Sequence, residues 1–478
     1  MQKISNKKLY LAILATGLMS FCGIVVETAM NITFPTLMKE FGVGTTAVQW
    51  TTTAYLLVVS IFVPISSFLK RRFSNRTLFI FANLCFIVGL LIDAFAMNII
   101  MLIAGRIVQG MAAGIALPLM FNIIIEYAPL QKIGFLMGIG TLVTAIAPAL
   151  GPTYGGLIVS TLTWHYIFIF LLPVMLISLI AGLYAIQADA FNKETKLDII
   201  SWLLIAIFFF GVINAATKLN SLQTQLPVFL IYLVAGILAI TAFVIRSRRV
   251  TQPIINLSIT QFKRFDLHLL SYFLMQLTNL GISFILPNYL QIVNHRTALI
   301  AGLLMLPGAA LGAVFAPIGG RIMDRFGARK PILTGILSQL VALFLLMLFA
   351  RHIQPMALSI IYILFMLGMG LQAGNIMTNG LKQVPKQLSA DGNALFNTAM
   401  QFAGALGTSI ISAIVAFSQQ GHAGSFASRT ALGAQNALIL LVILAAINTV
   451  SLIIALRTTK SKTTKATQNV MQESTERS

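Results

Sequence analysis

The stretch Leu9–Leu37, LYLAILATGLMSFCGIVVETAMNITFPTL, decides the fold, because it is a long apolar segment that carries a single acid, Glu27. A helix rises about 1.5 Å per residue and the hydrocarbon core of a bilayer is about 30 Å thick, so this segment can cross a membrane. Glu27 then lies inside the bilayer, where a carboxylate is costly. It is either a proton or cation site in a transport path, or an acid paired structurally with a base on a neighbouring helix. Acids inside spanning segments are functional by default, so we favour the first interpretation.

The whole chain has the composition of a membrane protein. Its 478 residues are 58% hydrophobic and 9% charged, with a mean hydropathy of +0.91, which excludes a soluble globular domain. Cys22 and Cys85 both lie in apolar segments, so no disulfide framework or metal site is expected. Apolar runs of about 20 residues predict an all-α polytopic fold of about 14 transmembrane helices. The predicted spans are 10–34, 47–69, 77–97, 99–124, 133–158, 164–186, 197–217, 226–246, 267–292, 298–318, 330–350, 356–377, 393–417 and 434–456.

The basic residues predict the orientation of these spans. With both termini in the cytoplasm, 26 of the 32 Lys and Arg residues fall in cytoplasmic segments, 5 fall in external loops, and Arg106 lies within a span. This bias follows the positive-inside rule, so the net charge of +20 indicates orientation in a lipid bilayer and no nucleic-acid partner is expected. Residues 458–478 are polar and predict a disordered cytoplasmic tail.

An internal repeat divides the chain. The segment SSFLKRRFSNRTLF after the second span resembles GGRIMDRFGARKPIL after the tenth, and an offset of 253 residues aligns Arg72-Phe73 with Arg325-Phe326. The same offset aligns the first span with the ninth and the fifth with the thirteenth. We therefore predict a six-helix bundle at 1–186, two inserted helices at 187–250 and a second six-helix bundle at 251–457. Facing bundles of this kind are a transporter architecture, with a substrate site near the bilayer midplane.

Two motifs resemble signatures of the major facilitator superfamily, and within it of the fourteen-span drug:proton antiporters of EmrB/QacA type. GGRIMDRFGARK matches the cytoplasmic loop signature, and LIAGRIVQGMAAG matches the signature of the fourth span, with Arg106, Gln109 and Gly110 in place. Asp324 can bond neighbouring arginines and a helix N-terminus, so the loop is expected to latch two helices when the inner gate is shut. The alternative is a solvated basic loop. The candidate latch residues are Gly320, Asp324, Arg325, Gly327 and Arg329.

A third motif, APALGPTYGG in the fifth span, is also shown by the antiporters of this family. Gly151 and Gly155, four residues apart, permit close approach of a neighbouring helix, and Pro152 permits a bend. A bendable, closely packed helix suits a gate, whereas close packing alone is the alternative. The candidate gating residues here are Pro148, Gly151, Pro152, Gly155 and Gly156.

Arg106 and Glu27 form the predicted coupling pair. Counting residues from the outer ends of their spans places both roughly 12 to 15 Å below the outer surface, so they can meet. The arginine keeps its proton, and so it can hold the acid ionised while the two are close and release it when the helices part. A permanent structural bridge is the alternative.

Other polar residues in the spans could line a substrate cavity. VETAMNITFP resembles the first-span signature of the family, although the acid stands one position later than the usual aspartate and is a glutamate, a departure that fits lincomycin-resistance-type exporters. The candidate cavity residues are Asn31, Trp50, Tyr55, Gln109, Asn122, Asn279, Asn375, Asn397 and Gln401. Hydrogen bonding between helices is the alternative for each. Asp93, Glu126, Asp198 and Asp266 stand near span ends and are expected to be solvated, with Glu126 kept as a second proton site.

The resemblance implies a secondary active exporter of the bacterial cell membrane that functions as a monomer. Protons would enter through Glu27 and drive lipophilic or cationic drugs outward by alternating access. The proton gradient would be the energy source, with no cofactor, and no GxxxxGK[ST] loop indicates an ATPase. The alternatives are a narrower exporter of a metabolite, peptide or lipid-like compound, a sodium-coupled drug exporter, and a membrane sensor or scaffold. A membrane enzyme is not expected, because no catalytic constellation is evident.

Overall fold

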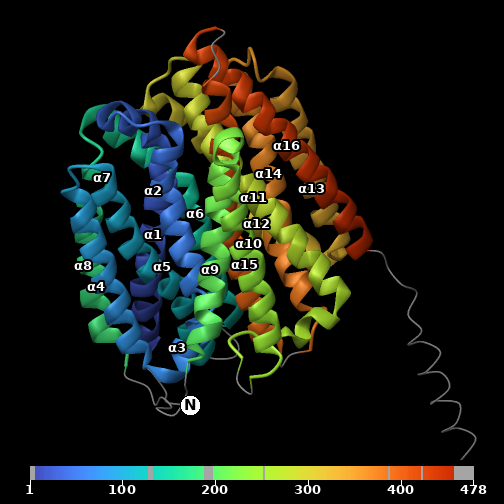
Figure 1. The fold of residues 1–478 in the computed structure, drawn as a ribbon. Helices are drawn as coiled ribbons and strands as arrows, with labels where there is room; N and C mark the ends of the chain where they lie inside the picture. The colour runs from blue at the N-terminus through green and yellow to red at the C-terminus, as the bar shows by residue number, and fades with distance from the viewer. Residues whose placement is uncertain are drawn as a thin grey trace, which may run out of the picture.

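The computed structural model describes residues 6–127, 133–187, 197–250, 253–385, 388–420 and 424–456, and these residues are almost entirely helical (Figure 1). The α-helices are α1 (Asn6–Phe41), α2 (Thr45–Phe62), α3 (Ser66–Arg72), α4 (Asn75–Ala94), α5 (Ile99–Tyr127), α6 (Ile133–Thr161), α7 (Tyr166–Ile169), α8 (Leu171–Ala185), α9 (Ile199–Thr217), α10 (Leu222–Ser247), α11 (Lys263–Ile292), α12 (Ala298–Phe326), α13 (Arg329–Phe349), α14 (Pro355–Leu381), α15 (Ser389–Gln419) and α16 (Phe426–Ala455). The predicted tail at 458–478 lies outside the described residues.

Every predicted span coincides with helix, so the all-α membrane fold is confirmed. Within the described residues, twelve helices are long and apolar enough to cross a membrane, and α2 and α6 are not among them. A count of fourteen spans therefore stays a prediction.

Two predicted spans are interrupted. The span predicted at 47–69 is wrong as a single helix, because α2 ends at Phe62 and α3 begins at Ser66. Pro64 lies in the break, where it has no N–H to donate to the helix and its ring clashes with the preceding turn. The span predicted at 164–186 begins as the short α7 and continues as α8 after Phe170.

The helices pack as two similar sets on either side of the inserted pair. In the first set α1 packs on α5, α6 and α8, and α5 packs on α2 and α4; in the second, α11 packs on α14, α15 and α16, and α14 packs on α12 and α13. The helix pairs correspond one to one, and α2 and α12 begin 253 residues apart, at Thr45 and Ala298. The repeat detected in the sequence is thus present in the packing.

The two sets meet along α6–α12 and α2–α15, pairs that the same correspondence exchanges. α9 packs on α10 and also on both α2 and α15, so it covers this second seam, as the central position of α9 in Figure 1 shows. Asp198 caps α9, and Arg246 of α10 contacts it through Nη2 at 2.8 Å. This ion pair ties the inserted helices together.

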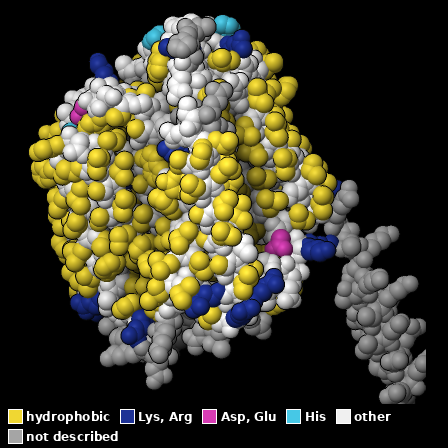
Figure 2. Space-filling view, viewed as in Figure 1, with side chains coloured by type: hydrophobic (Ala, Val, Ile, Leu, Met, Phe, Trp, Pro, Cys, Tyr) yellow, Lys and Arg dark blue, Asp and Glu magenta, His cyan; other side chains and the backbone are white. Residues whose placement is uncertain are grey.

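The two ends of the molecule differ in charge. Figure 2 shows hydrophobic side chains over the sides of the bundle, with Lys and Arg side chains gathered mainly at the end where α1 begins. We call this the basic end and the other the opposite end. At the opposite end α1 also contacts α11: Gln291 donates to the Ile32 carbonyl at 3.0 Å, and the rings of Phe34 and Phe284 are 5.8 Å apart. The helices α5 and α14 also correspond to each other, but their described residues show no packing of similar extent. The halves are therefore closed against each other at the opposite end.

Candidate transport site

Arg106 is the best-fixed buried charge in the described part of the chain. It lies on α5, is fully buried, and its Nε donates to the Thr51 carbonyl of α2 at 3.0 Å. Nη1 donates to Oε1 of Gln109 one turn further along α5. The guanidinium carbon lies 4.2 Å from the centre of the Tyr55 ring, a cation–π contact. α2 and α5 together therefore fix this guanidinium group.

Glu27 lies on α1, which packs against α2 and α5, and its charge acts on Tyr55 and Arg106 of the same cluster. The residue is 8% exposed, whereas Arg106 is 0% exposed. Their charges act on each other, yet no ion pair within 4 Å joins them in the described structure. The two residues of the predicted pair therefore interact electrostatically but form no salt bridge in this structure.

Three predicted cavity residues surround this cluster. Asn31 lies one turn beyond Glu27, is 2% exposed, and accepts a hydrogen bond from Thr52 at 3.4 Å. Tyr55 contributes the ring beneath Arg106, and Gln109 accepts from it while its own Nε2 lacks a partner in the described structure. Trp50, also predicted, is half-buried on α2. Asn31, Tyr55 and Gln109 therefore lie together around Arg106.

The other predicted cavity residues are spread over α5, α11, α14 and α15. Asn279, Asn397 and Gln401 are half-buried, and Asn397 donates to the carbonyl of Asn393, within its own helix. Asn375 is buried and donates to the Leu371 carbonyl. These two amides thus satisfy their own helix backbones.

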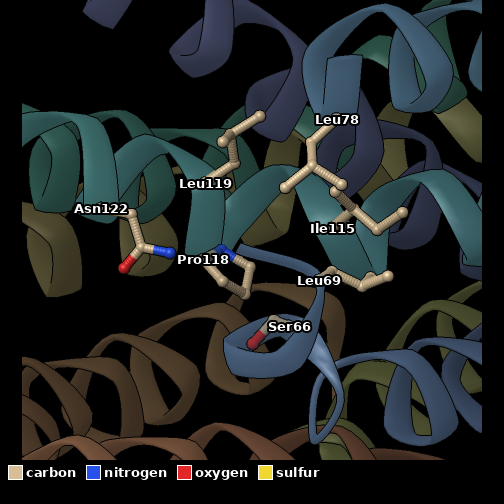
Figure 3. A pocket seen from close by; sticks show the side chains of 7 residues that line it. All are labelled: Ser66, Leu69, Leu78, Ile115, Pro118, Leu119 and Asn122. Carbon is tan, nitrogen blue, oxygen red and sulfur yellow. The ribbon is translucent and has the colours of Figure 1, made fainter. Parts of the chain in front are cut away.

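Asn122 lies well away from Arg106 on the same helix, about 24 Å along the axis. Figure 3 shows it beside a small recess between α5, α3 and α4, lined also by Pro118, Leu119 and Ser66. It is therefore not part of the Arg106 site.

The glycine motif of α6 packs on two helices at once. A Cβ at Gly151 would lie 1.8 Å from Oγ1 of Thr28, and one at Gly155 would lie 2.8 Å from the Ala29 carbonyl, both on α1. On the other face, a Cβ at Gly156 would lie 2.5 Å from the Ala298 carbonyl of α12. Pro152 is buried on that face, and its carbonyl would lie 2.5 Å from a Cβ at Gly302 of α12. The side chain of Pro148 is outside the described residues. The predicted gating helix is thus wedged between the two halves, next to the residues that follow Glu27.

A comparison with protein-family models matches residues 16–408 to the Major Facilitator Superfamily. The chain belongs to this superfamily. Among curated relatives, the lincomycin resistance protein LmrB of Listeria monocytogenes is 34% identical over 411 residues, which cover 86% of this chain and 87% of that protein. LmrB of Bacillus subtilis is 34% identical over 409 residues, 85% of each chain, and a multidrug resistance protein B homolog of Mycobacterium tuberculosis is 29% identical over 437 residues, 86% and 79% of the two chains.

Solved structures show the same fold at low sequence identity. A POT family transporter in complex with a thioalcohol conjugated peptide has a TM-score of 0.69 at 14% identity, covering 94% of this chain and 96% of that one. A bacterial homolog of the human lysosomal transporter Spinster, in an inward-facing and occupied conformation, has a TM-score of 0.65 at 15% identity, covering 95% and 98%. As a member of this superfamily the chain is a membrane transporter and not an enzyme.

The segment that carries the superfamily's cytoplasmic loop signature includes the end of α12, the link to α13 and the start of α13. Asp324 is exposed, and no hydrogen bond or ion pair to it is present among the described residues, so the latch that we predict is not formed here. Gly327 caps α12 with φ of +81°, a conformation that favours glycine. Arg325, like Lys330, stacks on Phe326, and Arg329 begins α13. Gly320 has open space around it. An unformed latch at the basic end agrees with closure of the halves at the opposite end.

Two of the acids predicted to be solvated are not. Asp93 is fully buried, because α5 packs directly over the last turn of α4. Asp198 is bonded to Arg246 and Ser201; burial raises the pKa of Asp198, but these hydrogen bonds outweigh it and leave the pKa below its ordinary value. Glu126, also kept as a proton site, is exposed as predicted; it forms an ion pair with Lys70 and accepts from Asn75 at 3.0 Å. Sequence analysis missed Asp93 because its place near a helix end suggested contact with water.

The Glu126 pair predicts a small effect of mutation. Glu126→Gln is expected to retain transport at close to the native rate and to lower stability by less than about 1 kcal/mol, because partly exposed ion pairs contribute little. Thermal unfolding in detergent and drug uptake into vesicles would measure both. A variant without proton-coupled uptake would contradict this account and make Glu126 a proton site.

Proposed function

We propose that the chain is a proton-coupled exporter of lipophilic or cationic drugs, with Glu27 as its proton-carrying group. The observation that supports this most is the arrangement around Arg106: a fully buried arginine, fixed by α2 and α5, faces a slightly exposed acid on α1 that it does not bridge. An acid that is close to a positive charge, yet not bonded to it, can gain and lose a proton as the helices move.

In this proposal the basic end is cytoplasmic, with both termini there, and the structure is the inward-facing state. Closure of α1 on α11 and of α6 on α12 at the opposite end supports this, as do the unformed Asp324 latch and the clustering of Lys and Arg. The similarity to the inward-facing Spinster homolog agrees with it. The location would be a bacterial cell membrane, with lipid as the surrounding partner, and the fourteen-span antiporter subtype is part of the proposal.

The cycle follows from electrostatics. In the inward-facing state Glu27 releases its proton to the cytoplasm, and a cationic or polarisable drug takes the proton's place beside the carboxylate. After the switch to the outward-facing state, a proton from outside displaces the drug. Moving one charge through 100 mV contributes about 2.3 kcal/mol before any pH difference is added. Aromatic groups such as Trp50 and Tyr55 can hold cationic drugs. The names of the relatives, lincomycin resistance and multidrug resistance proteins, support this substrate class.

Exchange of drug for protons tests the proposal. Inverted vesicles with a pH-sensitive dye are given ethidium, norfloxacin or lincomycin, and the native chain is expected to release protons on addition of a substrate. Glu27→Gln is expected to reduce this release at least tenfold, because a neutral amide has no proton to exchange. Glu126→Gln is the matched control and is expected to behave as the native chain does.

Two other outcomes of this assay would contradict parts of the proposal. Proton release that survives in Glu27→Gln would contradict the role of Glu27. If neither protein responds to any drug while both bind lincomycin, coupling to protons is wrong and a sodium gradient is the next candidate.

A further inference from the structure

Asp93 is a buried acid that the proposed cycle does not use. It lies in the last turn of α4 with 0% exposure, and both of its carboxyl oxygens lack a hydrogen-bond partner in the described structure. Nearly all buried polar groups in proteins are paired, and an unpaired buried carboxylate is among the costliest exceptions. A group of this kind at such a place requires an explanation beyond packing.

The neighbouring helix is shaped to receive this carboxyl group. A Cβ at Gly105 of α5 would lie 1.9 Å from Oδ1 of Asp93, so no other residue fits at Gly105 while Asp93 is in place. A Cβ at Gly89, one turn earlier on α4, would lie 2.5 Å from Cγ and 3.0 Å from the backbone N of Gln109. The two glycines let α4 and α5 approach until Asp93 lies against the backbone immediately before Arg106.

Arg106 therefore interacts electrostatically with two acids, Asp93 on α4 and Glu27 on α1. Both negative charges act on it, and its Nη2 lacks a hydrogen-bond partner among the described groups. Among the described residues, Arg106 is the charged group whose electrostatic interaction reaches the Asp93 carboxyl group. The other elements packed on α4 bring His165, whose Nε2 lies 3.1 Å from the Ala96 carbonyl, close to this end of the helix.

The charge balance of the cluster requires a shared proton. One arginine and two carboxylates would leave a net negative charge in a buried site, whereas a single proton on either acid makes the cluster neutral. Asp93 is 0% exposed and Glu27 is 8% exposed, so we expect the proton on Asp93 and an ionised Glu27 in this state.

We propose that Asp93 is a second proton-holding acid, which exchanges one proton with Glu27 across Arg106. This inference rests on the proposed function. The proton leaves the Asp93 carboxyl group and binds the Glu27 carboxylate, so that Asp93 becomes ionised, Glu27 becomes neutral, and the negative charge that acts on Arg106 moves from Glu27 to Asp93. Asp93 then takes up the next proton from the opposite end, near which α4 terminates. Glu27 lies 14 residues from the end of α1, so the relay carries protons from the opposite end toward the middle of the bundle.

Infrared spectroscopy of the purified protein tests this relay without transport. The native chain at neutral pH is expected to show the carbonyl stretch of one buried protonated carboxylic acid. Asp93→Asn is expected to lose this band. Glu27→Gln is expected to lose it too, because Asp93 then becomes the one acid facing Arg106 and must be ionised. Glu126→Gln is expected to keep it.

A band that persists in Glu27→Gln, or is missing from the native chain, would overturn the proposal even if Asp93→Asn fails to fold. Transport separates this result from the proposed function. Asp93→Asn is expected to lower uptake driven by a pH gradient at least tenfold while substrate counterflow, which needs no net proton movement, stays within about twofold of native. Native gradient-driven uptake in this variant would show that Asp93 is structural. If the native chain shows the expected infrared bands but does not couple transport to protons, the proposed proton-driven export is wrong and the proton exchange between Asp93 and Glu27 stands.

Discussion

Arg106→Ala is expected to abolish transport and to lower the stability of the folded protein by about 3–5 kcal/mol, the usual cost of removing one partner from buried charges. The substitution leaves Glu27 and Asp93 without their counter-charge, and it leaves the Thr51 carbonyl and Gln109 without their donor. It also removes the cation that stacks on Tyr55. Thermal unfolding in detergent would measure the loss of stability. The loss should shrink at acidic pH, because protonated acids no longer need the arginine.

Arg106→Lys is the matched control. Lysine keeps the positive charge but cannot reproduce the planar fork that bonds Thr51 and Gln109 together, so it should retain most of the stability and lose most of the transport rate. Native transport by Arg106→Ala would contradict the role given to this cluster. So would a finding that Arg106→Ala and Arg106→Lys are equally stable at neutral pH and again at acidic pH.

Gly156→Ala is expected to reduce transport at least tenfold by separating the two halves at the opposite end. The added carbon would lie 2.5 Å from the Ala298 carbonyl and 3.1 Å from the Cα of Leu299, backbone atoms that cannot turn away as a side chain could. The seam between α6 and α12 must then widen. The arrangement that is closed at the opposite end loses contacts, and the equilibrium shifts away from it.

Labelling of a cysteine at the seam measures this shift. In a background with Cys22 and Cys85 replaced, Leu299→Cys is expected to react slowly with a membrane-impermeant maleimide and several times faster when Gly156→Ala is added. Gly374→Ala on α14, where a Cβ meets open space, is the matched control and should change neither labelling nor transport. Unchanged labelling in Gly156→Ala would mean that this contact does not hold the halves together.

Much of this arrangement could be predicted from the sequence, because it depends on position along a helix. Counting residues from the span ends places Glu27 and Arg106 at one depth, and the 253-residue offset predicts the two sets of helices that the packing shows. The break between α2 and α3 was missed although Pro64 marks it, because the apolar run continues past the proline.

The errors concern contacts between helices, which residue counting does not reveal. Asp93 stands one residue from the end of α4, where an acid is usually solvated, and it is buried because two glycines bring α5 over it. Asp198, at the start of α9, is paired with Arg246 of α10. Asn122 is on the predicted helix but lines a recess far from Arg106 (Figure 3). Helix depth is a property of one segment, whereas burial depends on which neighbour packs against it.

Coupling to protons is the central claim, and uptake of lincomycin into sodium-free inverted vesicles tests it most directly. An acid-inside pH gradient with no membrane potential is the single driving force. We expect the native chain to accumulate lincomycin against its gradient, nigericin to abolish the accumulation, and Glu27→Gln to show none. Accumulation that needs a sodium gradient and ignores the pH gradient would contradict the account.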